Sequence, residues 1–204
     1  PYTTPLPIWG LWPTPCWEEI LRRFPAIDAV VQGEGEVALT EVARRLRRGQ
    51  VPFQEDIPNL AYRQGGRPRS NPRGPLLDPA SVAPLDLQAL PHLDRYNLFA
   101  YLTSRGCPHS CAFCSEQIVY NRYMEEPLPR ITVDLQALTG ALRPETYLWI
   151  SDPIFGTSSR RLAALAALLE ATPFQFLLES RVDILKPQDV PLLRRAGCDL
   201  IYFG

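Results

Sequence analysis

The sequence has little net charge and lacks a long apolar run. Its 204 residues carry a formal net charge of −1, which provides no electrostatic attraction to nucleic acid or to an anionic membrane. No uninterrupted apolar stretch is long enough to cross a bilayer, and the first residues do not match a secretory signal peptide. Internal repeats and low-complexity tracts are also missing. The sequence therefore favours neither a nucleic-acid partner nor a membrane partner.

Cysteine is scarce and odd in number. Five cysteines argue against a fully disulfide-paired secreted framework, so we expect a reducing, cytoplasmic environment. Cys16 and Cys198 each stand alone in the sequence and are expected to be small buried hydrophobic residues. Because the chain begins with Pro1 and ends directly after a predicted strand, we also expect a fragment that is truncated at both ends.

The spacing of the apolar residues predicts alternating helices and strands. Helical spacing is found in residues 17–24, 39–46, 131–142, 162–169 and 190–196. Short buried strands are expected over residues 26–31, 98–103, 146–151, 174–179 and 199–203. With 46% hydrophobic and 21% charged residues, this rhythm indicates a globular α/β protein.

Residues 51–95 interrupt the rhythm. Most of the 22 prolines lie either here or in the first 15 residues, and glycine, arginine and aspartate are frequent between them. We expect a linker between two domains, with a small hairpin around Gly65 and Gly66.

The stretch SRGCPHSCAFC, residues 104–114, contains Cys107, Cys111 and Cys114. It follows a predicted strand, and in a parallel α/β fold the loop after a strand commonly carries the chemistry. Three thiolates favour a soft metal centre. An iron-sulfur cube held by three of them would leave its fourth iron open to a substrate or cosubstrate. A zinc ion bound with the help of His109 is the alternative.

The segment CPHSCAFC resembles the CxxxCxxC signature of the radical SAM superfamily, with Phe113 at the usual aromatic position. The resemblance implies a partial TIM barrel and a 4Fe-4S cluster held by the three cysteines. It also implies that S-adenosylmethionine binds the open iron, with Phe113 beside this cofactor site. An electron, from a donor such as flavodoxin or ferredoxin, would then cleave the sulfonium to a 5′-deoxyadenosyl radical.

Polar residues end the next two predicted strands, where the family contacts the methionine part of S-adenosylmethionine. They are Ser151 and Asp152, then Glu179, Ser180 and Arg181. The resemblance implies that these residues bind the cofactor, and Arg181 could form a fork with its carboxylate. Alternatively, Asp152 is a turn or N-cap residue and Arg181 forms a structural salt bridge.

A second resemblance lies in residues 8–36, IWGLWPTPCWEEILRRFPAIDAVVQGEGE. They are similar to the end of the cobalamin-binding domain that precedes many radical SAM modules. Gly10, Thr14, Gly33 and Gly35 match positions where that family packs its backbone close to the corrin, which glycine permits. The alternative is that QGEGE forms an ordinary strand-to-helix turn, with acidic residues near the helix N-terminus.

These observations together predict an α/β chain in three parts. Residues 1–50 would be the C-terminal half of a Rossmann-like cobalamin-binding domain, residues 51–95 a linker, and residues 96–204 the first half of a (βα)6 partial TIM barrel. The implied function is a cobalamin-dependent radical SAM enzyme that methylates an unactivated carbon or phosphorus of a small-molecule substrate. Two alternatives are a radical SAM enzyme without cobalamin that catalyses cyclisation or rearrangement, and a zinc-stabilised binding module without catalysis.

Overall fold

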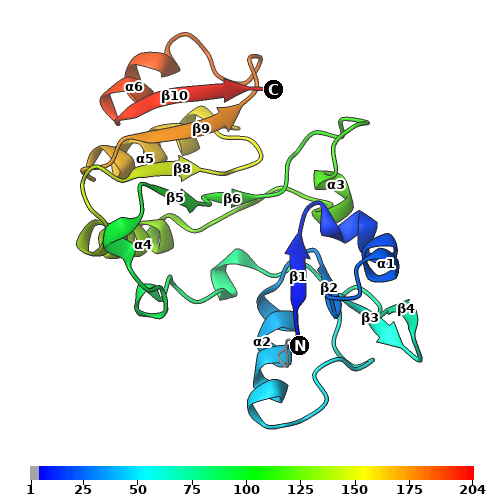
Figure 1. Cartoon of the computed structure of the whole chain (residues 1–204). Helices are drawn as coiled ribbons and strands as arrows, with labels where there is room; N and C mark the ends of the chain where they lie inside the picture. Colours follow the sequence, from blue (N-terminus) through cyan, green and yellow to red (C-terminus); the bar gives the residue numbers. More distant parts are fainter. Residues whose placement is uncertain (1–4) are drawn as a thin grey trace. The chain divides into compact units, whose positions relative to one another are not determined.

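The computed structural model describes residues 5–204, which divide into two compact units (Figure 1). The first unit runs to Leu77 and also includes His109–Arg122. The second unit combines Asp78–Pro108 with Tyr123–Gly204. Each unit contains a sheet with parallel strands and its own helices, which confirms the predicted α/β class.

The first unit is built on a four-stranded sheet with the order β1-β2-β3-β4. Strands β1 and β2 are parallel, whereas β3 and β4 are each antiparallel to their predecessor. The elements of this unit are β1 (Pro7–Gly10), α1 (Pro13–Arg23), β2 (Ala29–Gln32), α2 (Glu36–Arg47), β3 (Leu60–Gln64), β4 (Arg67–Ser70) and α3 (Glu116–Val119).

Strand β2 is the centre of this unit because its side chains are buried on both faces. Val30 packs with Ile20 of α1, whereas the next residue, Val31, packs with Val42 of α2. Successive side chains of a strand point to opposite faces, so the run AVVQ brings a helix to each side of the sheet.

The hairpin predicted around Gly65 and Gly66 is present and joins β3 to β4. Both glycines have positive φ angles, which suits the tight turn. Residues 60–70, which the sequence analysis assigned to the linker, therefore belong to the first sheet. The strand signal was weak because β4 is an exposed edge strand with proline and arginine, residue types that apolar periodicity does not detect.

The second unit is built on a four-stranded sheet with the order β10-β9-β8-β5, in which every neighbouring pair is parallel. A separate antiparallel pair is formed by β6 and β7. Three short 3-10 turns precede β5: η1 (Pro79–Ser81), η2 (Leu87–Ala89) and η3 (Leu93–Arg95). The other elements are β5 (Leu98–Tyr101), β6 (Ser104–Arg105), β7 (Met124–Glu125), α4 (Leu128–Ala141), β8 (Tyr147–Ile150), α5 (Ser159–Glu170), β9 (Phe176–Ser180), α6 (Asp189–Arg195) and β10 (Cys198–Phe203).

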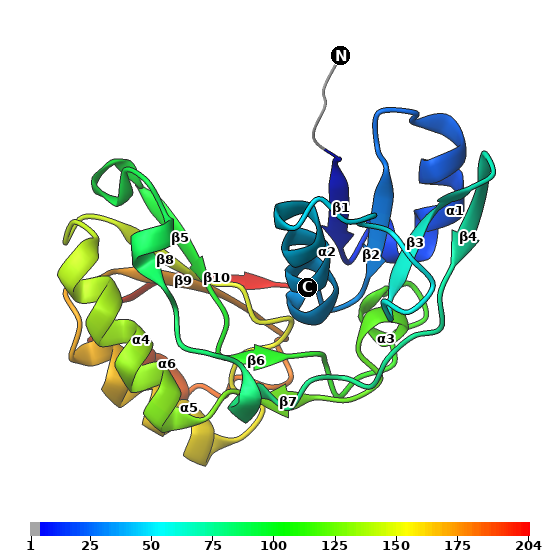
Figure 2. The ribbon, with the colours of Figure 1, turned by 90° about the horizontal axis from the view of Figure 1, so that it is seen from below.

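Helices α4, α5 and α6 cover one face of this parallel sheet (Figure 2). Alternate strand residues point into the core beneath them, among them Leu148, Ile150 and Phe176, which are fully buried. Ser158 caps α5 by accepting a hydrogen bond from the Arg161 backbone N–H. Within residues 5–204, no helix combines the length and apolar character needed to span a membrane.

Candidate functional site

The cysteine loop follows β5, as the sequence predicted, and the short strand β6 lies between β5 and Cys107. Gly106 adopts a positive φ angle of +71° immediately before Cys107, so a glycine is required where the chain bends. Cys107, Cys111 and Cys114 form no disulfide, and all three are half-buried. The Cys114 N–H donates to the Cys111 carbonyl at 3.0 Å, so a turn holds the backbones of these two cysteines close together in space.

The three thiols of this loop are, by their chemistry, suitable ligands for an iron-sulfur cluster. Two buried polar atoms nearby, His109 Nε2 and Glu116 Oε2, have no hydrogen-bond partner, which is typical of a site built to receive a further group. Burial also raises the pKa of the Glu116 carboxyl. Within residues 5–204, however, no three histidine, cysteine or acidic side chains are arranged to hold a metal ion. The assignment of the three cysteines as ligands therefore stays a prediction.

The carboxylate of Asp152 holds the chain that leads into the loop. Its Oδ1 accepts the backbone N–H groups of Thr103 and Ser104 at 2.6 and 3.1 Å. Its Oδ2 accepts the hydroxyls of the same two residues at 2.5 and 2.8 Å. All three residues are buried, and burial raises the pKa of Asp152 to about 6 against the opposing effect of the four donors.

These contacts give Asp152 a role as an anchor between the ends of β8 and β5. This geometry resembles the turn alternative more closely than a free cofactor ligand, because four donors already occupy both oxygens. The neighbouring Ser151 is half-buried, and its backbone N–H donates to the Tyr101 carbonyl at 2.9 Å. A direct contact of either residue with S-adenosylmethionine stays a prediction.

Arg161 on α5 also holds the chain that leads into the loop, through hydrogen bonds to backbone carbonyls. Its Nη2 donates to the carbonyls of Thr103 and Glu126 at 3.0 and 2.7 Å, and the residue is only 8% exposed. The Glu126 carboxylate in turn accepts from Arg105 Nε at 3.0 Å. A charged and largely buried network therefore fixes the backbone just before Cys107.

The residues at the end of β9 face different partners. Ser180 is buried and donates its hydroxyl to the Phe155 carbonyl at 2.8 Å, while the Glu179 carbonyl accepts the Phe155 N–H. The Arg181 guanidinium forms two hydrogen bonds with Asp183, at 2.9 and 2.7 Å. This pair is the structural salt bridge considered above, and the proposed contact of Arg181 with a carboxylate of the cofactor remains untested.

The structure brings Gly10, Thr14 and Gly33 together in the first unit. The buried Thr14 hydroxyl donates to the Gly10 carbonyl at 2.7 Å and accepts the Gly33 N–H at 2.8 Å, so it ties the ends of β1 and β2. Gly35 precedes α2, and a Cβ atom there would lie 2.9 Å from Leu39. The tight backbone expected of this region is present, whereas a contact with a corrin stays a prediction.

Phe113 and the two isolated cysteines complete the predicted set. Phe113 is 92% exposed, so its ring is available to a bound molecule. Cys198 is buried as predicted, and burial raises the pKa of its thiol to about 11. Cys16 is half-buried beside the core under α1.

Sequence reasoning missed Thr103, Ser104 and Arg161. The first two could have been found, because they follow the end of β5 and Asp152 follows the end of the neighbouring strand β8. Arg161 carried no such signal, since an arginine in the first turn of an amphipathic helix is ordinarily solvent-exposed.

The chain is similar to known proteins in sequence and in fold. No protein-family model matches the chain. It is 27% identical over 194 residues to the uncharacterized methyltransferase PH0819 of Pyrococcus horikoshii, covering 92% of this chain and 42% of that protein. It is 29% identical over 162 residues to the cobalamin-dependent radical SAM methyltransferase TokK of Streptomyces tokunonensis, covering 74% and 23%. The solved structure of the cobalamin-dependent S-adenosylmethionine radical enzyme OxsB matches with a TM-score of 0.66 and 20% identity, over 92% of this chain and 29% of that chain.

PH0819 is named as a methyltransferase, and the name of TokK confirms the resemblance to the cobalamin-dependent radical SAM superfamily that the cysteine motif and residues 8–36 together suggested. The match to OxsB shows a shared mixed α/β fold with parallel strands. The chain spans less than half the length of each of these proteins.

Proposed function

We propose that this chain carries the cofactor-binding part of a cobalamin-dependent radical SAM methyltransferase. The observation that carries the proposal is the CxxxCxxC loop at the carboxyl end of β5, the first strand of an all-parallel sheet. The similarity to TokK over 74% of the chain supports the same class. A small molecule with an unactivated carbon or phosphorus is the proposed substrate, and a flavodoxin or ferredoxin the proposed electron donor.

The architecture proposed from the sequence is compatible with both units. In the second unit β5, β8, β9 and β10 lie side by side in chain order, with helices on one face, as expected for the first half of a (βα)6 barrel. In the first unit a parallel β1–β2 pair lies between helices, as expected for the end of a Rossmann-like domain.

In this proposal, Cys107, Cys111 and Cys114 hold three irons of a 4Fe-4S cluster. With cobalamin at the Gly10–Gly33 turns, the bound cofactors would supply a 5′-deoxyadenosyl radical and a transferable methyl group. The chain's own contribution is positioning: Asp152 and Arg161 fix the backbone before Cys107. The exposed ring of Phe113 provides an apolar surface beside the cysteines.

The function is tested by anaerobic reconstitution of the full-length protein, followed by dithionite and S-adenosylmethionine. We expect 5′-deoxyadenosine and S-adenosylhomocysteine among the products. Changing any one of the three loop cysteines to alanine should abolish cluster binding, whereas the control Cys198→Ala should keep the iron content. A loaded cluster that yields neither product, or a full cluster in Cys111→Ala, contradicts the proposal.

The same preparation separates the alternatives. A protein without corrin absorbance after reconstitution that still forms 5′-deoxyadenosine supports a radical SAM enzyme that works without cobalamin. One equivalent of zinc, without iron or labile sulfide, supports a non-catalytic binding module.

A further inference from the structure

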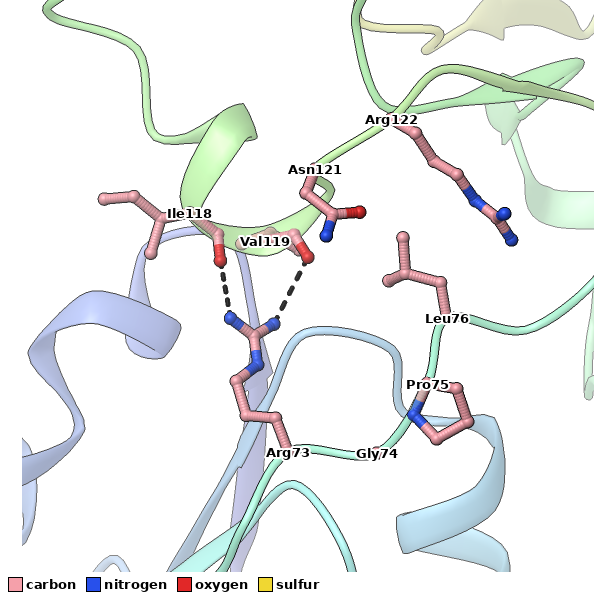
Figure 3. Close-up of a pocket in the computed structure, with 8 residues that line it drawn as sticks. All are labelled: Arg73, Gly74, Pro75, Leu76, Ile118, Val119, Asn121 and Arg122. Atoms are coloured by element: carbon pink, nitrogen blue, oxygen red, sulfur yellow. Dashed lines mark hydrogen bonds between the residues drawn. The ribbon is translucent and has the colours of Figure 1, made fainter.

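The second half of the cysteine loop leads into the short helix α3, and Arg73 donates hydrogen bonds to the end of that helix (Figure 3). Arg73 Nη1 donates to the Ile118 carbonyl at 2.5 Å, and its Nη2 donates to the Val119 carbonyl at 3.2 Å. The last carbonyls of a helix have no partner within the helix, so a guanidinium that takes two of them fixes the helix end. Both carbonyls lie within five residues of Cys114.

Gly33 makes room for this contact. A Cβ atom on Gly33 would lie only 2.7 Å from Arg73 Nη2 and 3.9 Å from Val119 Cγ1. The turn after β2 therefore admits the guanidinium because its residue has no side chain. This gives Gly33, together with its positive φ angle of +84°, a reason to be glycine that does not involve a cofactor.

Two further hydrogen bonds order the segment that carries Cys111 and Cys114, and one of them comes from α3. Gln117 Nε2 donates to the His109 carbonyl at 2.7 Å, which closes residues 109–117 into a ring. Inside the ring, the Cys114 N–H donates to the Cys111 carbonyl at 3.0 Å. A displacement of α3 therefore moves the backbone that carries both cysteines.

We propose that Arg73 is a positioning residue for Cys111 and Cys114, which it links through the carbonyls of α3 to the segment that follows β4, close beside Gly33. The cluster part of this inference rests on the proposed function, whereas the anchoring of residues 109–119 does not. A cavity of about 400 Å³ lies beside the guanidinium, lined also by Asn121 and Arg122. Shorter or uncharged side chains therefore fit at position 73 without a steric clash.

The first test compares Arg73→Met, Arg73→Lys and the control Arg122→Met in the full-length protein. Arg122 lines the same cavity, but the hydrogen bonds drawn to α3 come from Arg73 alone (Figure 3). Hydrogen exchange of residues 109–119 in the cluster-free protein should be about tenfold faster in Arg73→Met, because two charge-assisted hydrogen bonds are lost. Arg73→Lys should recover part of the protection, and Arg122→Met should match the wild type.

The second test uses the space at Gly33. Gly33→Ala pushes a Cβ against the guanidinium and should speed exchange of the same segment, whereas Gly65→Ala is the matched control. Gly65 also has a positive φ angle, +58°, but no atom lies within 4 Å of its added Cβ. In the double variant Gly33→Ala/Arg73→Met, the two effects on residues 109–119 should not add.

The third test reads the cluster itself. After reconstitution, Arg73→Met should lose iron to a chelator about tenfold faster than wild type and show an altered electron paramagnetic resonance spectrum of the reduced cluster. Unchanged exchange and unchanged iron loss in Arg73→Met overturn the inference even if the wild type cleaves S-adenosylmethionine. If hydrogen exchange is faster in Arg73→Met but the wild type never binds a cluster, the anchoring role of Arg73 is supported and the proposed function is overturned.

Discussion

The two halves of the cysteine loop are held by opposite chemistry. The chain before Cys107 is fixed by the buried carboxylate of Asp152, which accepts four hydrogen bonds inside the second unit. The segment after Cys114 is fixed by the guanidinium of Arg73, a largely exposed residue of the first unit that donates two. A buried anchor contributes to the stability of the whole unit, whereas an exposed anchor controls only local order. Substitutions of the residues that hold the loop, and a change of pH, test this difference.

Asp152→Ala should have the largest effect. It leaves two backbone N–H groups and two hydroxyls of Thr103 and Ser104 without their acceptor in a buried site, so we expect a loss of about 4 kcal/mol of unfolding free energy. Urea unfolding of the apo protein, followed by circular dichroism, measures this loss.

Asp152→Asn is the matched variant for this prediction. Its Oδ1 can accept both backbone N–H groups, while its amide donates to the two hydroxyls, so all four hydrogen bonds survive with two reversed in direction. Equal losses in Asp152→Ala and Asp152→Asn would show that hydrogen bonding does not explain the anchor.

The pH dependence of stability should come next in size. Burial raises the pKa of Asp152 from 3.8 to about 6 in the folded protein, so between these values the folded state binds more protons than the unfolded state. Stability from this group is therefore full below pH 3.8 and falls, by about 3 kcal/mol in total, as pH rises through 6. When unfolding is measured between pH 4 and 8, the free energy of unfolding of the wild type should decrease relative to that of Asp152→Asn as pH increases. Parallel curves would contradict the shift.

Arg161→Met should cost about 2 kcal/mol, because it removes the side-chain donor to the buried carbonyls of Thr103 and Glu126 while keeping most of the apolar stem. The Thr103 carbonyl keeps its second donor, the Glu126 backbone N–H. The control is Arg160→Met, at an exposed neighbouring position of the same helix. If thermal unfolding gives the same Tm for Arg161→Met and Arg160→Met, Arg161 does not help to hold the chain before Cys107.

Arg73→Met should have the smallest effect on global stability, less than about 1 kcal/mol, because the side chain is exposed and water can replace it at the carbonyls. Global unfolding in urea measures this value beside the local exchange of residues 109–119. A loss as large as that of Asp152→Ala would end the distinction between the two anchors.

Much of this arrangement could be predicted from local sequence patterns. Alternation of apolar residues placed β5, β8, β9 and β10 within three residues of their observed bounds, and the cysteine spacing located the loop after β5. Asp152 was singled out because a polar residue ended a buried strand. The strands of the β3–β4 hairpin were assigned to the linker because an exposed edge strand containing Pro68 carries almost no apolar signal.

The partners of the charged residues could not be predicted in the same way. Arg73 lies 45 residues before Ile118 in the chain, and Arg161 lies 58 residues after Thr103. No local pattern connects such pairs, because a guanidinium can donate to any carbonyl that the fold brings within reach.

The sequence by itself determined the α/β rhythm and the placement of three thiols after a strand, since both follow from side-chain spacing over a few residues. Only the tertiary structure decided that the Asp152 carboxylate accepts hydrogen bonds from Thr103 and Ser104, and that Gly33 leaves space for Arg73. Those outcomes depend on which chain segments meet in three dimensions, and hydrogen bonds and steric exclusion act only between groups that the fold has already brought together.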